Sequence, residues 1–247
     1  MSNPNGWAVV YDFDGTLIPK MIGALMPVVA QLGLAEEAME DMHAVHSKYI
    51  GLFDAGIITG AQYRAWLVEE FELYIRHRLT AADWQTALAH VRLRPGVVEL
   101  MAELHAAGVR QCVISGAVAD FVEYVLEING ASHLVEDVYA AKLLHDPRGT
   151  VVGYDENSFV HLENKGEWSM YFAGLHRIDP RRVIALGDSI GDARLGHLRA
   201  NRIGIAETRE QAAVLASLGI MGQVVVVDGH LEPASSAIRR LLGLPSI

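Results

Sequence analysis

The spacing of apolar and polar positions changes character along the 247-residue chain. Residues 7–13 form a short apolar run that ends at a Gly-Thr turn, which predicts a buried β-strand. Between residues 17 and 93 the apolar positions recur at intervals of three and four, which predicts helices. The helices expected in this block cover residues 34–52, 62–78 and 81–91, with Thr59 and Thr80 as N-caps.

After residues 94–96 short apolar runs alternate with helical patterns, which is typical of a parallel, doubly wound sheet with helices on both faces. We expect helices at 97–107, 118–128, 167–175, 193–198 and 209–218, and strands at 109–115, 183–186, 203–206 and 224–227. A hairpin of residues 135–144 and 150–154 interrupts the alternation. The predicted fold is therefore an α/β core of residues 1–16 and 94–247, with residues 17–93 inserted as a helical cap.

Composition narrows the functional classes. A formal net charge of -10 does not fit a surface that neutralises nucleic-acid phosphates, so we expect no nucleic-acid partner. No apolar run approaches the roughly 20 residues of a membrane-spanning helix, and the first residues do not form a signal peptide. We therefore expect a cytoplasmic protein without membrane contact, in which the single cysteine, Cys112, is a small core residue.

Four polar segments follow predicted strands or begin predicted helices, where parallel sheets place their ligand sites. They comprise residues 12–16, Ser115 with Gly116, Lys165, and residues 187–192. Asp12 and Asp14 lie two residues apart on an extended segment, so both carboxylates project to one side. These two carboxylates repel each other unless a cation lies between them. With Asp188 as a further ligand, the set consists of carboxylate oxygens, which favours Mg²⁺ over zinc. Each segment taken alone is also compatible with an ordinary turn, helix cap or surface lysine.

Together these four segments resemble the signature motifs of the haloacid dehalogenase superfamily of phosphotransferases, spread over residues 7–230. The helical block between the first two motifs is similar to the cap of the branch that includes phosphoserine phosphatases and pyrimidine 5'-nucleotidases. The resemblance implies a Rossmann-like core and a Mg²⁺-dependent phosphoric monoester hydrolase that acts on a small-molecule phosphate ester.

Carried onto this chain, the resemblance implies that Asp12 attacks phosphorus and forms an aspartyl-phosphate. Asp14 would protonate the leaving group and then activate water. The Asp12 carboxylate, the Asp14 backbone carbonyl and Asp188 would hold Mg²⁺, with Asp192 supporting them. The resemblance also implies that an aspartate at position 14 favours phosphate hydrolysis over dehalogenation.

The phosphoryl oxygens need donors that are already in place before the reaction. We expect the Ser115 hydroxyl and the Gly116 N–H, at the start of a helix, to provide them, with Lys165 as a point charge. The site would then be locally cationic in an anionic protein.

The substrate stays open at this level. Phosphoserine phosphatases usually carry a glutamate shortly after the first motif, and residues 17–21 contain none. The alternatives are a 5'-nucleotidase acting on nucleoside monophosphates, or a phosphomutase or phosphotransferase of the same superfamily. Four cap residues either face a substrate or pack in the cap: Tyr49, Phe53, Arg64 and Trp66. His43 and His46, one helical turn apart, are more typical of a helix face than of a metal site.

Overall fold

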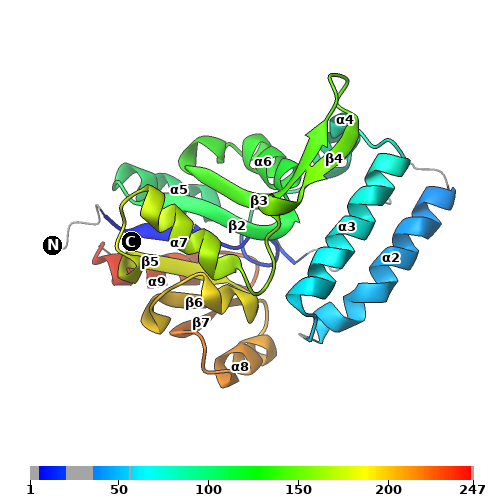
Figure 1. Ribbon diagram of the computed structural model, residues 1–247. Helices are drawn as coiled ribbons and strands as arrows, with labels where there is room; N and C mark the ends of the chain where they lie inside the picture. Colours follow the sequence, from blue (N-terminus) through cyan, green and yellow to red (C-terminus); the bar gives the residue numbers. More distant parts are fainter. Residues whose placement is uncertain (1–5, 21–35, 56, 246–247) are drawn as a thin grey trace.

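The computed structural model describes residues 6–20, 36–55 and 57–245. A seven-stranded sheet with the order β4-β3-β2-β1-β5-β6-β7 forms the centre of the protein (Figure 1). Neighbouring strands run parallel except β3 and β4, which form an antiparallel hairpin at one edge. The strands are β1 (Ala8–Tyr11), β2 (Arg110–Val118), β3 (Asp137–His145), β4 (Val151–Asp155), β5 (Val183–Gly187), β6 (Arg202–Ala206) and β7 (Gln223–Val226). The predicted α/β fold is confirmed.

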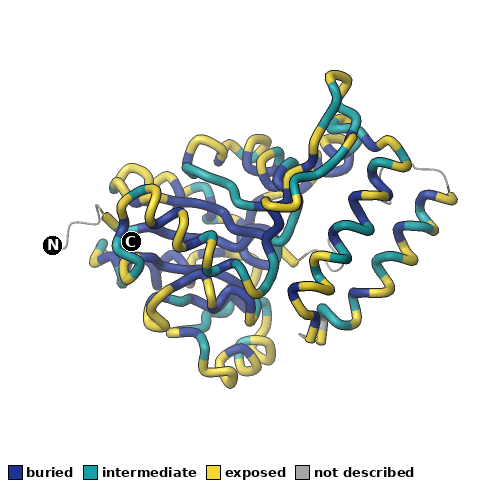
Figure 2. The backbone as a smooth tube through the Cα atoms, in the orientation of Figure 1, coloured by how far each residue is buried: buried dark blue, intermediate teal, exposed yellow. Residues whose placement is uncertain are grey.

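Helices cover both faces of this sheet, which leaves its central strands buried (Figure 2). These helices are α5 (Val97–Ala106), α6 (Ala119–Ile128), α7 (Lys165–Leu175), α8 (Arg209–Ser217) and α9 (Glu232–Leu242). Successive residues of β1 point to opposite faces: Val9 and Tyr11 pack toward α5, α6 and α9, whereas Ala8 and Val10 pack toward α7. Burial on both faces explains why β1 reads as a continuous apolar run.

Helices α2 (Glu36–Asp54) and α3 (Gly60–Arg76) pack on each other beside the sheet, and we call this pair the cap (Figure 1). Helix α4 (Ala81–Leu88) returns to the core, where the ring centroids of Trp84 and Phe121 lie 4.5 Å apart. Both N-cap predictions are confirmed, because Thr59 and Thr80 each form a capping box. The start predicted for the first cap helix, residue 34, lies outside the described residues.

The helix predicted at 193–198 is wrong. The chain forms a short 3-10 turn, η4 (Gly191–Arg194), and then runs close to the sheet. A Cβ at Gly196 would lie 3.0 Å from Arg202 Cγ and 3.2 Å from Ala185 Cβ. Local helical spacing is therefore overridden by a close tertiary approach, for which the small size of glycine leaves room.

The expectation that Ser115 and Gly116 begin a helix is also wrong. Strand β2 continues to Val118, with a register shift against β3 between Ile114 and Val118, and α6 starts at Ala119. Helix α9 was not predicted, although Gly243 ends it in the left-handed conformation that commonly terminates helices. Among the described residues, no helix is long and apolar enough to cross a bilayer.

Candidate active site

Asp12 lies directly after β1, at the carboxyl edge of the sheet. Its backbone N–H donates to Leu186 O of β5 at 2.9 Å, so the sheet fixes its position. The chain then turns sharply, because the Phe13 carbonyl accepts N–H groups from Thr16 and Leu17. Gly15 makes this turn possible: it has a φ of +76°, and a Cβ there would lie 2.4 Å from Asp188 Oδ2.

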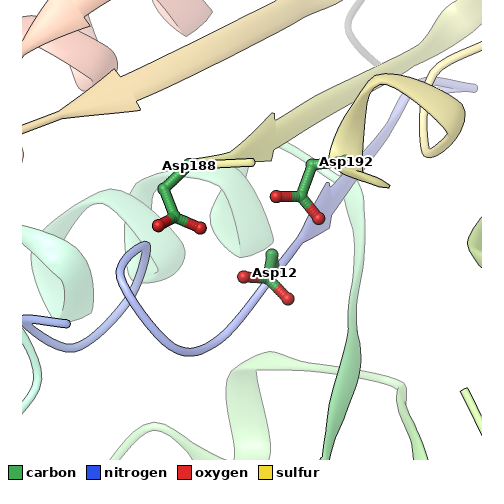
Figure 3. Close-up of side chains that lie close together, drawn as sticks. All are labelled: Asp12, Asp188 and Asp192. Carbon is green, nitrogen blue, oxygen red and sulfur yellow. The ribbon is translucent and has the colours of Figure 1, made fainter. Parts of the chain in front are cut away.

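Three carboxylates meet at this edge (Figure 3). Asp12, Asp188 and Asp192 each offer an oxygen, and these oxygens lie within 4.8 Å of one another. Gly187 permits the approach, since a Cβ at this position would lie 2.1 Å from Asp192 Cβ. Within the described ranges, this is the group of carboxylates that lie close enough together to hold a metal ion.

Lys165 joins two of these carboxylates. Its Nζ donates to Asp12 Oδ1 at 2.7 Å and to Asp192 Oδ1 at 2.6 Å, and the side chain is buried. Burial acts to lower the pKa of Lys165, but the charges of Asp12 and Asp192 outweigh it and raise the pKa. The lysine is therefore a permanent cation that holds the Asp12 carboxylate in one orientation.

The second oxygen of Asp192 is also occupied. Asp192 Oδ2 accepts the backbone N–H of Ser189 at 2.9 Å and the Ser189 hydroxyl at 2.6 Å. With one oxygen on Lys165 and the other on Ser189, this carboxylate acts as a support for the lysine and for the turn after β5. Asp188 differs, because its side chain is 16% exposed and its nearest cation is Lys20 Nζ, 3.6 Å away.

The electrostatics of the cluster favour an additional cation. Burial, followed by the neighbouring Asp192, raises the pKa of Asp12 well above its usual range, and Lys165 opposes this rise. The same two causes raise the pKa of Asp188 to about 6. A divalent cation would act in the same direction as Lys165, and carboxylate oxygens are the donors that Mg²⁺ prefers. The donor set therefore fits Mg²⁺.

Asp14 lies on the same turn and is partly buried. Its charge contributes to raising the pKa of Asp188, which places it beside the same cluster. Its side chain is not a member of the three-carboxylate group, so a role for Asp14 in holding a metal depends on its backbone carbonyl.

The end of β2, which is the neighbour of β1 in the sheet, lies at the same edge. Ser115 is buried, and its Oγ accepts the backbone N–H of Ala117 at 3.1 Å. The carbonyl of Gly116 accepts the hydroxyl of Tyr63, which reaches across from the cap, at 3.1 Å. Sequence reasoning missed Tyr63 and Lys20, since neither belongs to a motif and their contacts arise only when the chain is folded.

The cap residues considered from sequence fall into two groups. Tyr49, Phe53 and Trp66 form an aromatic cluster with Tyr63, with ring centroids 5.8 to 6.0 Å apart. Arg64 turns away to pair with Glu156 next to the hairpin. His46 packs edge-on against the Trp66 ring, and the metal group within the described part of the chain contains no histidine.

Comparison with known proteins gives the family. A sequence model of haloacid dehalogenase-like hydrolases matches residues 9–197. The phosphoglycolate phosphatase of Caulobacter vibrioides is 24% identical over 259 residues, covering 98% of this chain and 95% of that protein. The phosphoserine phosphatase of Idiomarina loihiensis is 29% identical over 125 residues, covering 51% of this chain and 54% of that protein.

Solved structures show the same fold. Cytosolic 5'-nucleotidase IIIB bound to cytidine has a TM-score of 0.70 at 22% identity, covering 96% of this chain and 86% of that chain. A phospho-aspartyl intermediate analogue of phosphoserine phosphatase has a TM-score of 0.65 at 16% identity, covering 93% and 97%. At 16% and 22% identity, this likeness shows a shared fold alone.

Proposed function

Because the chain belongs to the haloacid dehalogenase-like hydrolases, we propose that it is a Mg²⁺-dependent phosphatase. It hydrolyses a small phosphate monoester through an aspartyl-phosphate on Asp12. The observation that carries this proposal is the buried Asp12 carboxylate, which is fixed by Lys165 beside Asp188 at the carboxyl edge of the sheet. The phosphatase names of two relatives support a phosphoric monoester hydrolase.

In the proposed first step, an oxygen of the Asp12 carboxylate attacks phosphorus and the bond from phosphorus to the leaving alkoxide breaks. Asp14 gives its proton to that alkoxide, which leaves as an alcohol. In the second step, Asp14 takes a proton from water as the water oxygen attacks phosphorus. The bond between phosphorus and the Asp12 oxygen breaks, inorganic phosphate departs, and both aspartates return to their starting protonation states.

The remaining residues bind and orient. Lys165 and the Ser115 hydroxyl would hold phosphoryl oxygens, and Gly116 would contribute its backbone N–H from the end of β2. The carboxylates of Asp12 and Asp188 and the backbone carbonyl of Asp14 would hold Mg²⁺. When bound, the cation offsets negative charge on the phosphoryl group and on Asp12.

Asp192 would support this set from behind, through Lys165 and Ser189. We also propose a cytoplasmic location, because the buried Cys112 is the only cysteine in the chain and has no partner for an internal disulfide.

The experiment is phosphate release by the purified chain from p-nitrophenyl phosphate and from a panel of metabolite phosphates. We expect turnover with Mg²⁺, loss of turnover with EDTA, and recovery when Mg²⁺ is restored. Asp12→Asn should abolish turnover, whereas Asp179→Asn, at an exposed aspartate paired with Arg181, should not. If the folded wild-type chain releases no phosphate from any ester, the proposal fails.

A nucleoside monophosphate is the second candidate substrate. The aromatic cluster of Phe53, Tyr63 and Trp66 adjoins Gly116 through Tyr63, and flat rings stack well on aromatic side chains. The metabolite panel should therefore include purine and pyrimidine 5'-monophosphates beside phosphoserine and phosphoglycolate. Adding an acceptor alcohol distinguishes a phosphomutase or phosphotransferase, which would yield a new phosphate ester instead of free phosphate.

A further inference from the structure

We infer that Tyr63 is a positioning residue that sets the orientation of Ser115 when the cap rests on the core. This inference rests on the proposed phosphatase function and adds a cap residue to its machinery. Tyr63 would act through β2 without touching the reacting atoms. It would make cap closure a condition for a correctly oriented phosphate donor.

Two hydrogen bonds connect Tyr63 to Ser115 through one peptide group. The Tyr63 hydroxyl donates to the carbonyl oxygen of Gly116 at 3.1 Å. The N–H of the same peptide group, on Ala117, donates to Ser115 Oγ at 3.1 Å. Fixing the carbonyl end of a planar peptide group also fixes its N–H end. Because Ser115 Oγ accepts from Ala117, its own proton is directed elsewhere, and a phosphoryl oxygen is the acceptor that the proposed reaction supplies.

The direction of donation along this series of hydrogen bonds is fixed. Burial raises the pKa of Tyr63, so its hydroxyl stays protonated and serves as a donor to the carbonyl. Each hydrogen bond in such a series polarises the next, which strengthens donation at its far end. Lys165, Asp12 and Asp14 all affect the pKa of Tyr63, which places the hydroxyl beside the catalytic groups.

The cap holds the Tyr63 ring in place. Its centroid lies 6.0 Å from that of Phe53 and 5.9 Å from that of Trp66. Helix α3 is anchored on the core by Gly60 N, which donates to Glu163 Oε1 at 3.3 Å, and by the ion pair of Arg64 with Glu156. The hydroxyl reaches Gly116 only with α3 in this position, so the contact reports whether the cap is closed.

The fit at Gly116 leaves no spare room. A Cβ at this residue would lie 2.4 Å from the Tyr63 hydroxyl oxygen and 3.2 Å from Tyr63 Cζ. Glycine at position 116 therefore allows the tyrosine to approach the strand. A substitution at either residue should disturb the same contact.

The test is Tyr63→Phe, which keeps the ring and removes the hydroxyl. The matched control is Tyr154→Phe, because the Tyr154 hydroxyl also joins the cap to the core, at 3.1 Å from Glu72 Oε1, but lies at the hairpin. We expect Tyr63→Phe to lower kcat/KM about tenfold, as the loss of one hydrogen bond allows, and Tyr154→Phe to leave it unchanged.

A double-mutant cycle with Ser115→Ala separates positioning from packing. If Tyr63 acts through Ser115, adding Tyr63→Phe to Ser115→Ala should lower kcat/KM further by less than about twofold. The inference is overturned if Tyr63→Phe matches wild type, or if its effect is undiminished in the Ser115→Ala background. If Tyr63→Phe does not fold, Phe53→Leu, which loosens the packing of the Tyr63 ring and leaves β2 unchanged, serves instead in the same cycle, with a loss of kcat/KM expected again. An inactive wild-type chain would instead refute the proposed phosphatase function.

Discussion

Glu70, on the buried side of cap helix α3, provides a test of the electrostatics that is independent of activity. The residue is 8% exposed, and its Oε1 accepts the Trp66 Nε1–H at 2.7 Å. Burial raises the pKa of Glu70 from 4.5 to about 8, and the Trp66 hydrogen bond only partly opposes this. The charge of Glu70 in turn raises the pKa values of the nearby Tyr63 and Tyr74.

The sign follows from proton binding. Between pH 4.5 and 8 the unfolded chain has lost the Glu70 proton while the folded chain retains it, so raising the pH favours unfolding. Each pH unit in this window lowers the unfolding free energy of wild type by about 1.4 kcal/mol through this group. From pH 5 to pH 8 the loss approaches about 4 kcal/mol, as an upper limit for full retention of the proton.

Glu70→Gln should remove this dependence, because the neutral amide accepts from Trp66 and never ionises. In urea unfolding at pH 5, 6, 7 and 8, the stability of Glu70→Gln relative to wild type should rise steadily with pH. The control is Glu69→Gln, next along the helix, where hydrogen bonds from Lys48 and Tyr49 lower the pKa of the carboxyl. A relative stability of Glu70→Gln that stays constant over this range would refute the reasoning.

Three further outcomes test other parts of the structure. Gly15→Ala should lose most activity, because its Cβ displaces Asp188. Gly219→Ala is the control: this residue has a φ of +65° and open space around it, so the substitution should cost only about 1–3 kcal/mol of stability and leave kcat/KM unchanged. Equal kcat/KM values for the two variants would contradict the argument that a Cβ at Gly15 displaces Asp188. Thr80→Ala should cost about 1 kcal/mol in urea unfolding with kcat/KM unchanged, and an unaltered midpoint would show that the capping box contributes nothing. Inorganic phosphate should raise the melting temperature clearly with Mg²⁺ and little after EDTA, and equal shifts would argue against a shared site.

The sequence predicted the sheet and both N-cap threonines, because these depend on local periodicity and on local hydrogen bonds. It also indicated the residues at the strand ends, because parallel strands place their carboxyl ends at one edge of a sheet. Asp12 and Asp188 are such residues: each follows an apolar run, and the fold brings them together. The contact of Tyr63 with Gly116 spans 53 positions and depends on how the cap packs, which no local pattern encodes. The same dependence on packing explains the wrong helix at 193–198: local spacing predicted it, but the chain runs close to β5 at Gly196.

The charges around Asp12 show how an anionic protein can accept an anionic substrate. Lys165 already pairs with two carboxylates, so its charge alone does not make the site cationic, although its Nζ can still contact a phosphoryl oxygen. Asp188 adds a third carboxylate, which the half-exposed Lys20 faces from 3.6 Å. Attraction must then come from a bound cation and from oriented neutral donors, since dipoles fixed by the fold do not reorganise when charge develops. The Ser115 hydroxyl is such a donor, and the peptide group that Tyr63 holds provides its orientation. On this reasoning, contact of the cap with β2 completes the set of donors that an anionic site lacks when the cap is open.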